Sequence, residues 1–316
     1  MERLALSSRA IIGRFYETLE KSLAGSWASK VGMSFDSNQE SEEYKWLGMA
    51  PGLREWIGGR VAHGLRSEGY TLKNKVFEAT LEIDINDLRR DKTGQIQVRI
   101  DEMADRAAEH WEELCSSLML ANGLCYDGSD FYDTDHEEGD SGAQKNLLTA
   151  TEVGALDIGA ATTPTADEAA DAIMGVIGYF YTYKDDKGKP INGQARDFII
   201  MCPVSFWAPF TTAVSANNLN TGSGVRDNPL QGVMRQGVSM AVLANPLLTW
   251  TTDFAIFRTD GRAKPFILQE EVGVQVSAIA EGSEEEFKND RHLYGVKTVR
   301  NAGYGMWQHA IKATFS

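Results

Sequence analysis

Cysteine and long apolar runs are both scarce in this chain of 316 residues. The three cysteines, Cys115, Cys125 and Cys202, form neither a CxxC pair nor the spacing of a disulfide framework, so we expect buried free thiols. No uncharged run approaches the roughly 20 residues that span a bilayer. The amphipathic residues 1–25 are interrupted by charges, unlike the apolar block of a signal peptide. These absences predict a soluble, cytoplasmic product without a membrane partner.

Basic residues are also few, since 31 Lys and Arg stand against 45 Asp and Glu, for a formal net charge of -14. Neutralising phosphate requires clustered Lys and Arg, so this balance argues against a sequence-reading nucleic-acid interface. It is compatible with a container that holds DNA without gripping it. A chain of this length that is 42% hydrophobic can remove about three quarters of its unfolded surface from water, which allows two domains.

The most informative stretch is residues 46–84, which has aromatic anchors and then a charged hairpin pattern without a core of its own. One arm runs from Trp56 to Arg66 and the turn lies at Ser67 to Gly69. Apolar residues mark an extended return arm: Leu72, Val76, Leu81, Ile83 and Ile85. Each arm would span about 12 residues, or roughly 40 Å. An isolated two-stranded ribbon is marginal in water, so we expect the hairpin to lie on a neighbouring subunit.

This hairpin is basic on an otherwise acidic chain, and two interpretations remain open. The charges could simply keep a solvated ribbon soluble and protect its strand edges. They could instead complement an acidic patch on the next subunit and fix the register of the contact. We favour the second, because a ribbon without a core must rest on a surface. The candidate subunit-interface residues are Arg54, Arg60, Arg66, Tyr70, Lys73 and Lys75.

Helical patterns occur in several places. Residues 1–45 contain a short helix and a polar passage, which we interpret as an arm. Apolar residues at spacings of three and four then predict a long helix that stops at Asn122 and Gly123: Ile96, Ile100, Met103, Ala107, Trp111, Leu114 and Leu118. Thr165 and Glu168 have the spacing of a capping box before another helical face. Residues 205–216 predict a further helix.

Strand patterns dominate the second half. Residues 198–203 are wholly apolar and predict a buried strand, and residues 238–245, 253–259 and 265–279 predict three more. Residues 294–315 close the chain with further strand pattern. The composition of residues 124–150 and 217–236 is typical of loops. The chain therefore reads as an α+β body with an extended hairpin.

Four segments together resemble the major head subunit of Mu-like phages, a gpT-like family within the HK97-fold capsid superfamily. They are YKWLGMAPGLREWIGGR at 44–60, YTLKNKVFEATLEIDINDL at 70–88, LCYDGSDFYDTDH at 124–136 and YGVKTVRNAGYGMWQHA at 294–310. The resemblance implies an N-terminal arm at 1–53, an E-loop hairpin at 54–85 and a peripheral domain with a spine helix at 86–149. It further implies an axial domain at 150–265 and return strands of the peripheral domain at 266–316.

The same resemblance implies a function. The chain would assemble with itself as hexamers and pentamers into an icosahedral shell, with each E-loop across an adjacent subunit. The shell would enclose double-stranded DNA without sequence-specific binding. A scaffold, a maturation protease and a portal would be its other partners. The subunit would be made in the cytoplasm of a bacterial host and end in the virion, with no catalytic residues, no cofactor and no metal. An encapsulin-like nanocompartment shell is the alternative within this fold.

An acidic loop provides an alternative from another class. It contains Asp127, Asp130, Asp133, Asp135, His136, Glu137 and Glu138, which could hold a divalent metal for a hydrolase. Counted from Asp133, however, the glycine position of an EF-hand is Glu138 and its final glutamate is Gln144. A solvated acidic loop is the competing interpretation.

Other motifs favour structure over chemistry. The five histidines, at 63, 110, 136, 292 and 309, lie in no recognisable catalytic motif, and we expect packing or an interface for His110. Residues 188–190 read as a turn, because they lack the glycine and the Ser or Thr of a phosphate loop. Tyr294, Tyr304 and Trp307 could stack on bases, but core packing is the simpler interpretation.

Overall fold

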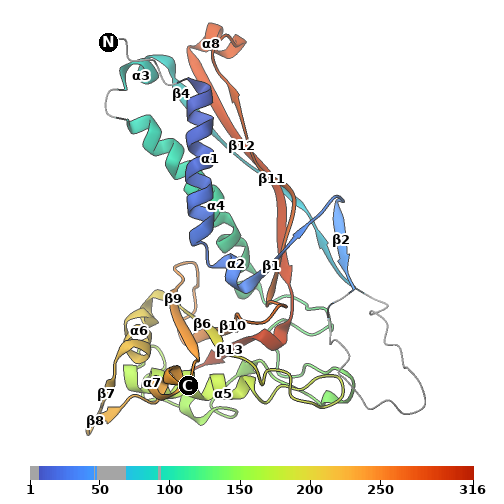
Figure 1. Ribbon diagram of the computed structural model, residues 1–316, viewed down its shortest axis with the longest axis vertical. Coiled ribbons are helices and arrows are strands. Elements are labelled where there is room, and N and C mark those ends of the chain that lie inside the picture. Colours follow the sequence, from blue (N-terminus) through green and yellow to red (C-terminus); the bar gives the residue numbers. More distant parts are fainter. Residues whose placement is uncertain (1–6, 46, 48–68, 92–93) are drawn as a thin grey trace, which may run out of the picture.

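The computed structural model describes residues 7–45, 47, 69–91 and 94–316. A long, narrow sheet with two helices on one face rises from a compact lower body (Figure 1). The chain is thus α+β, as the sequence predicts. None of the helices among the described residues is long and apolar enough to cross a membrane.

The long sheet has the strand order β1-β11-β12-β4. Its strands are β1 (Gly32–Asp36), β11 (Phe266–Ile279), β12 (Arg291–Tyr304) and β4 (Lys75–Asp84). β11 and β12 form an antiparallel hairpin of 14 residues in each strand, or about 45 Å at about 3.3 Å per residue. Alternate residues of β12 are buried, as expected for a sheet with one covered face. The short helix α8 (Glu284–Asn289) lies at the far end of this hairpin.

Two helices cover that face. α4 (Gln95–Ala121) is the predicted long helix. Of the predicted apolar stripe only Ile100 is fully buried and the other residues are partly buried, because the most buried face lies one position further along, at Ala104, Ala108, Cys115 and Met119. The helix ends at Asn122, whose positive φ of 46° confirms the left-handed termination. α1 (Ser8–Gly25) packs beside α4, with Ile11, Phe15 and Leu19 in the shared core.

The N-terminal region is more firmly attached than the predicted arm. Arg14 of α1 pairs with Asp101 of α4 at 3.1 Å, and the Thr18 hydroxyl donates to the same carboxylate at 2.8 Å. α2 (Ala28–Val31) follows, and β1 then joins the long sheet in parallel with β11. The polar passage thus contributes to β1 and β2 (Ser41–Tyr44). Its backbone groups are satisfied because β1 pairs with β11 and β2 pairs with β3 (Tyr70–Lys73).

The predicted hairpin is corrected in its second half, and its first arm, Trp56 to Arg66, lies outside the described residues. β3 (Tyr70–Lys73) pairs with β2, and β4 pairs along its whole length with β12. Residues 70–84 therefore rest on their own chain. The physical reason is that β12 offers a long edge of unpaired backbone groups, which periodicity within the hairpin cannot reveal. α3 (Ile85–Arg90) follows β4.

The compact body has a five-stranded sheet of order β5-β13-β10-β6-β9. Its strands are β5 (Leu147–Leu148), β13 (Ala310–Thr314), β10 (Asp253–Arg258), β6 (Asp197–Cys202) and β9 (Ser239–Ala244). The predicted buried strand is β6, in which all residues after Asp197 are buried. Residues 310–314 thus belong to this sheet, which differs from their expected place among the peripheral return strands, because β10 and β5 pair with them on both sides.

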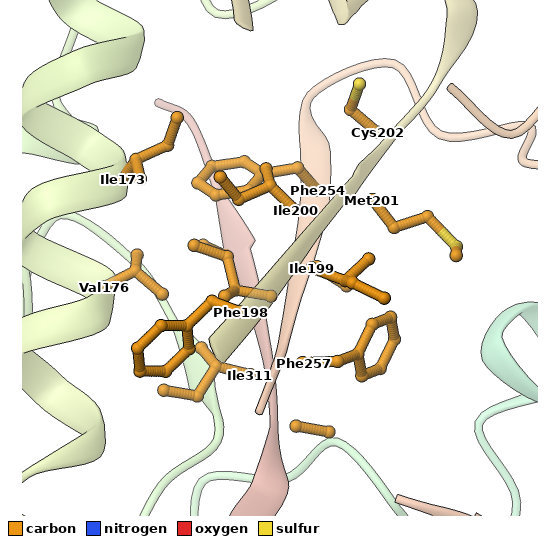
Figure 2. Packing of buried hydrophobic residues seen from close by; sticks show 14 of the residues in the cluster. Ile173, Val176, Phe198, Ile199, Ile200, Met201, Cys202, Phe254, Phe257 and Ile311 are labelled. Carbon is orange, nitrogen blue, oxygen red and sulfur yellow. The ribbon is translucent and has the colours of Figure 1, made fainter. Parts of the chain in front are cut away.

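Helices α5 (Ala166–Phe180) and α6 (Trp207–Ser215) pack on this sheet. Val176 of α5 lies beside Phe198 and Ile311 of the sheet, and Ile173 lies toward Ile200 and Phe254 (Figure 2). The other end of α4 also reaches this core through Cys115 and Met119. One continuous apolar cluster therefore connects the compact body to the long helix.

Residues 217–236 are not the long loop that their composition predicts. They form a hairpin, β7 (Asn218–Thr221) and β8 (Gly224–Asp227), followed by α7 (Pro229–Arg235). Asn228 caps α7, since its side chain accepts from the Leu230 amide at 3.0 Å. The turn-forming residues here make the tight turn of a hairpin and the start of a helix. Composition alone does not distinguish these from a loop. Short 3-10 helices span Gly139–Ser141, Gly154–Leu156, Val204–Phe206 and Trp307–His309.

The predicted capping box of α5 is present and gives a simple test. The Thr165 hydroxyl accepts from the Glu168 amide at 3.2 Å, and the Glu168 carboxylate accepts from the Thr165 amide at 2.8 Å. We expect Thr165→Ala to lower the free energy of unfolding by about 1 kcal/mol, because one helix N-terminal amide loses its acceptor. Urea denaturation measures this. The exposed Thr162→Ala, three residues earlier, is the control and should leave the midpoint unchanged.

Candidate functional site

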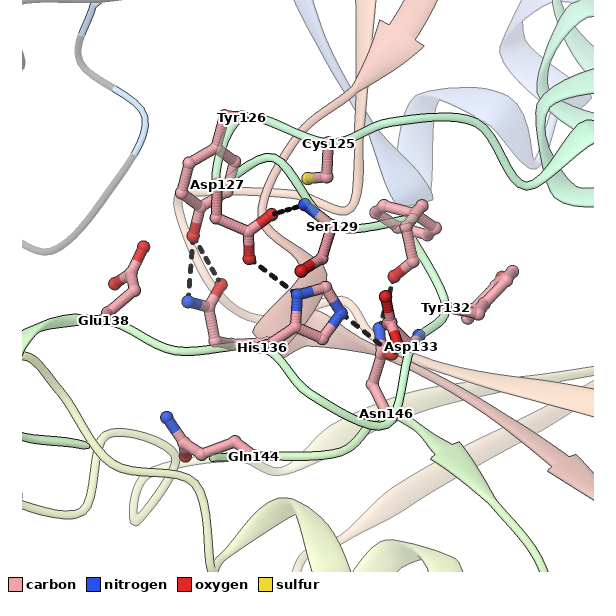
Figure 3. Close-up of polar contacts among 12 residues, drawn as sticks. Cys125, Tyr126, Asp127, Ser129, Tyr132, Asp133, His136, Glu138, Gln144 and Asn146 are labelled. Carbon is pink, nitrogen blue, oxygen red and sulfur yellow. Dashed lines mark hydrogen bonds and ion pairs between the residues drawn. The ribbon is translucent and has the colours of Figure 1, made fainter. Parts of the chain in front are cut away.

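The acidic loop is organised around a buried histidine. The His136 side chain is fully buried, and its Nδ1 lies 2.6 Å from Oδ2 of Asp127, which is 3% exposed. Its Nε2 lies 3.2 Å from Oδ1 of Asn146. That amide is fixed in turn, because its Nδ2 donates to the Phe131 carbonyl at 2.7 Å and its Oδ1 accepts from the Asp133 amide at 2.8 Å. Both ring nitrogens of His136 therefore face oxygen acceptors (Figure 3).

The ring of His136 is also stacked on Trp307. The ring centroids are 4.0 Å apart and the planes differ by 8°. Trp307 is itself fully buried, and its ring meets Tyr183 edge-on at 5.5 Å. The loop 124–150 is thus held against the C-terminal part of the chain by a flat, closely packed contact.

A second polar contact of this loop joins Tyr126 to Gln308. The Tyr126 hydroxyl accepts from Nε2 of Gln308 at 2.9 Å and donates to its Oε1 at 3.2 Å. Burial raises the pKa of Tyr126 well above its usual value, with the Glu138 carboxylate adding to the effect. Burial likewise raises the pKa of the Cys125 thiol. These groups stay neutral and act as packed, hydrogen-bonded parts of the core.

The acidic loop is therefore neither fully solvated nor arranged as a metal site. Asp127, His136 and Glu138 point inward, which corrects the solvated interpretation, whereas Asp135 and Glu137 are exposed. Throughout the described ranges, which include all of this loop, no group of three or more His, Cys, Asp or Glu side chains could hold a metal ion. The stacking of Trp307 that buries His136 could not be foreseen from residue spacing.

The predicted subunit-interface residues differ in where they lie. Arg54, Arg60 and Arg66 lie outside the described residues. Tyr70 is used within its own chain, because its hydroxyl accepts from the Tyr304 amide at 3.3 Å. Its ring packs on Gly303, where an added Cβ would lie 2.9 Å from the ring. Tyr70 thus packs within its own chain, and its contact with a neighbouring subunit stays a prediction.

The two lysines remain at the surface. Lys73 pairs with Glu40 at 2.6 Å, an exposed ion pair within the chain. Lys75 is exposed at the start of β4. Within the described residues β4 has a strand neighbour on one side only, and Val76 on it is 63% exposed. The edge of β4 is thus a candidate contact surface, since an unpaired strand edge can accept another chain.

The remaining predictions about single residues hold. His110 packs edge-on against Phe77, and its Nδ1 accepts from Nε of Arg300 at 3.0 Å. Burial and the Arg300 charge lower the pKa of His110 to about 4, so the imidazole is a neutral acceptor. The predicted core aromatics Tyr294, Tyr304 and Trp307 are all buried, as are the three free cysteines. Gly188 lies in a turn with φ of 74°, as expected.

Comparison with known proteins gives a consistent result. Residues 6–162 and 226–315 match the family described as Mu-like prophage major head subunit gpT. The Mu-like prophage FluMu major head subunit of Haemophilus influenzae is 35% identical over 134 residues, which are 41% of this chain and 44% of that protein. The major capsid protein of Escherichia phage Mu is 37% identical over 116 residues, 36% of this chain and 38% of that protein. The chain thus covers less than half of each relative.

Among solved structures, the procapsid of bacteriophage JBD30 contains a similar chain. The TM-score is 0.56 at 24% identity, and the match covers 98% of this chain and 75% of that one. At this identity the comparison bears on the fold. The expected HK97-like arrangement is confirmed.

Proposed function

The chain belongs to the Mu-like prophage major head subunit gpT family, and on that premise we propose that it is a phage major capsid subunit. It assembles with itself, as hexamers and pentamers, into an icosahedral shell around double-stranded DNA. The observation that carries this proposal is the family match, which includes the long sheet and most of the compact body apart from residues 163–225. Fold similarity to a phage procapsid along nearly the whole chain supports it.

The parts of the chain have proposed roles. Residues 54–85 form the E-loop, residues 86–149 the peripheral domain with α4 as its spine, and residues 150–265 the axial domain. Residues 1–53 form the N-terminal arm and residues 266–316 the return strands, of which β13 joins the five-stranded sheet. An elongated sheet joined to a compact body suits a shell, because it gives one subunit several separate surfaces for neighbours.

The proposed partners follow from the same premise. A scaffold, a maturation protease and a portal act with the subunit during head assembly in the bacterial cytoplasm, and the finished shell is the virion capsid. The packaged DNA is held without sequence-specific contacts. The formal net charge of -14 supports this, since clustered phosphate contacts would need a basic surface.

Particle formation tests the proposal directly. The chain is expressed alone and together with neighbouring phage genes, and particle mass is measured by light scattering with electron microscopy of the heavy fraction. We expect closed shells, or separate hexamers and pentamers. A stable monomer or dimer under both conditions would contradict the proposal. The nucleic-acid content of shells distinguishes a phage head from a compartment that packages protein.

The basic hairpin gives a sharper test at Arg60 and Arg66. We expect the double variant Arg60→Glu with Arg66→Glu to lose most of its particles, because both charges would then repel an acidic neighbouring surface. Its circular dichroism and urea midpoint should match those of the original chain. Lys187→Glu with Lys189→Glu, an equal change of charge in an exposed turn, is the control. Normal shells from the arginine variant would remove these residues from the interface.

A further inference from the structure

A groove lies between α4 and the outer edge of the long sheet. Its volume is roughly 150 Å³, and its walls are largely apolar, with Phe77, Ala79, Met103 and Val296 among them. Of the strands of the long sheet, α4 packs mainly against β12, and the neighbouring strand β4 is partly uncovered, with Ala79 exposed. A dry cavity of about 150 Å³ is large enough to bind a benzene ring. The groove can therefore take one aromatic side chain.

A buried cation lines the same groove. Arg300 is 1% exposed and donates to the Ala107 carbonyl at 2.7 Å as well as to His110, and its guanidinium lies 4.6 Å from the centre of the Trp111 ring. The carboxylate of Glu270 is 4.0 Å from it. Burial lowers the pKa of Arg300 to about 10. At 4.0 Å the Glu270 carboxylate only partly compensates the buried charge of Arg300, so additional negative charge near the guanidinium is favourable.

One exposed cation completes the lining. Arg106 of α4 adds its charge to that of Arg300, whereas the Glu78 carboxylate accepts from the Thr80 hydroxyl at 3.2 Å, on the opposite face of β4. Two cations against the carboxylate of Glu270 make the groove attractive to an acidic partner, whereas the formal charge of the whole chain is negative.

The complementary shape is at the end of the same sheet. α8 begins with Glu284, Glu285 and Glu286, and Ser283 caps it by accepting from the Glu286 amide. No residue of this helix is buried, and Phe287 is 90% exposed. Leaving a Phe side chain in water forgoes the favourable free energy of burying its apolar surface. α8 thus presents an exposed aromatic ring on a short helix that carries three glutamates and one lysine, Lys288.

We propose that α8 of one copy docks into this groove of a second copy, with the Phe287 ring between α4 and β4 and its glutamates facing Arg106 and Arg300. The two surfaces cannot meet within one chain. From Arg291, next to α8, to Thr298, which lines the groove, the rigid strand β12 runs about 23 Å at about 3.3 Å per residue.

The contact therefore joins different patches on two copies, a heterologous interface that propagates or closes into rings. This inference rests on the proposed shell and names a contact that would help to build it. Each contact is small, but a shell repeats it many times, which multiplies its effect on assembly.

Cysteine cross-linking tests the docking in the assembled protein. Copies carrying Phe287→Cys are mixed with copies carrying Ala79→Cys, and particles are oxidised and run on non-reducing gels. We expect a disulfide-linked dimer, because docking would bring the two Cβ atoms to within the roughly 3.5–4.5 Å that a disulfide requires. The native cysteines are buried and give little background. Thr80→Cys, on the opposite face of β4, is the matched control and should give several-fold less dimer with the Phe287→Cys copies.

A charge change in the groove adds a second readout. Arg106→Glu should lower the yield of cross-linked dimer, because it places a negative charge opposite an acidic helix. Particles that form normally without the cross-link, or with equal cross-linking through Thr80→Cys, would overturn the docking and leave the shell intact.

Two other outcomes are equally decisive. If the unmodified chain stays a monomer or dimer under all conditions, the proposed function itself fails. If Phe287→Cys copies form no particles, recovery of particles by Phe287→Tyr but not by Phe287→Ser would support the docked ring. Equal recovery, or none, would overturn it.

Discussion

Replacing Trp307 by Ala should lower the free energy of unfolding by about 3–5 kcal/mol, which is the usual range when a buried aromatic ring is removed. The Trp307 ring is fully buried, stacks on His136 at 4.0 Å and meets Tyr183 at 5.5 Å. Its loss leaves a cavity at the place where the loop 124–150 rests on the C-terminal segment. Urea denaturation followed by circular dichroism measures the change.

A second tryptophan provides the control for this experiment. Trp207 begins α6 and is 53% exposed. Trp207→Ala removes the same ring from a position that largely faces solvent, so we expect a change of no more than about 0.5 kcal/mol. Equal losses in the two variants would mean that the stacking of Trp307 on His136 does not hold the loop.

Asp127→Ala should also be destabilising, by about 1–3 kcal/mol, because it leaves a buried ring nitrogen of His136 without its hydrogen-bond partner. Asp127 accepts from the ring of His136 and also from the Ser129 amide at 3.2 Å. Without it, Nδ1 of a fully buried imidazole faces no acceptor. The urea midpoint reports the loss, and particle yield reports its effect on assembly.

Two further variants separate charge from hydrogen bonding. Asp127→Asn keeps an oxygen acceptor in nearly the same shape, so it should retain more stability than Asp127→Ala. Asp135→Ala removes an exposed carboxylate from the same loop and should change stability by no more than about 0.5 kcal/mol. If Asp135→Ala were as damaging as Asp127→Ala, the loop would depend on its total charge rather than on the buried pair.

Both variants concern the loop that looked most like a catalytic or metal site. Its carboxylates suggested chemistry because clustered oxygen ligands suit divalent cations. In the structure the inward-facing carboxylates are separated, because Asp127 bonds to His136 and Glu138 lies near Tyr126. The other carboxylates of the loop point to solvent. In this chain the loop is joined to Trp307 and Gln308 through His136 and Tyr126.

Local features were predictable from the sequence. The apolar stripe of α4 and its end at Asn122, the capping box at Thr165 and Glu168, and the buried strand β6 all depend on residues within a few turns or strand positions of each other. Periodicity and capping describe such neighbours directly. The family was also recognisable, because four short segments carry it in a fixed order.

Only the tertiary structure decided which distant segments pair. Arg300 reaches His110 across a separation of 190 residues, β4 takes its partner in β12, and β13 returns to the compact body. The side-chain pattern of β4 predicts an extended strand but does not identify the strand that it pairs with. Any unpaired strand edge can satisfy the backbone groups of β4. The sequence by itself therefore determined the family and those elements that local patterns mark, such as α4, α5 and β6, whereas packing between remote segments decided that the return arm rests on its own chain and that His136 is buried.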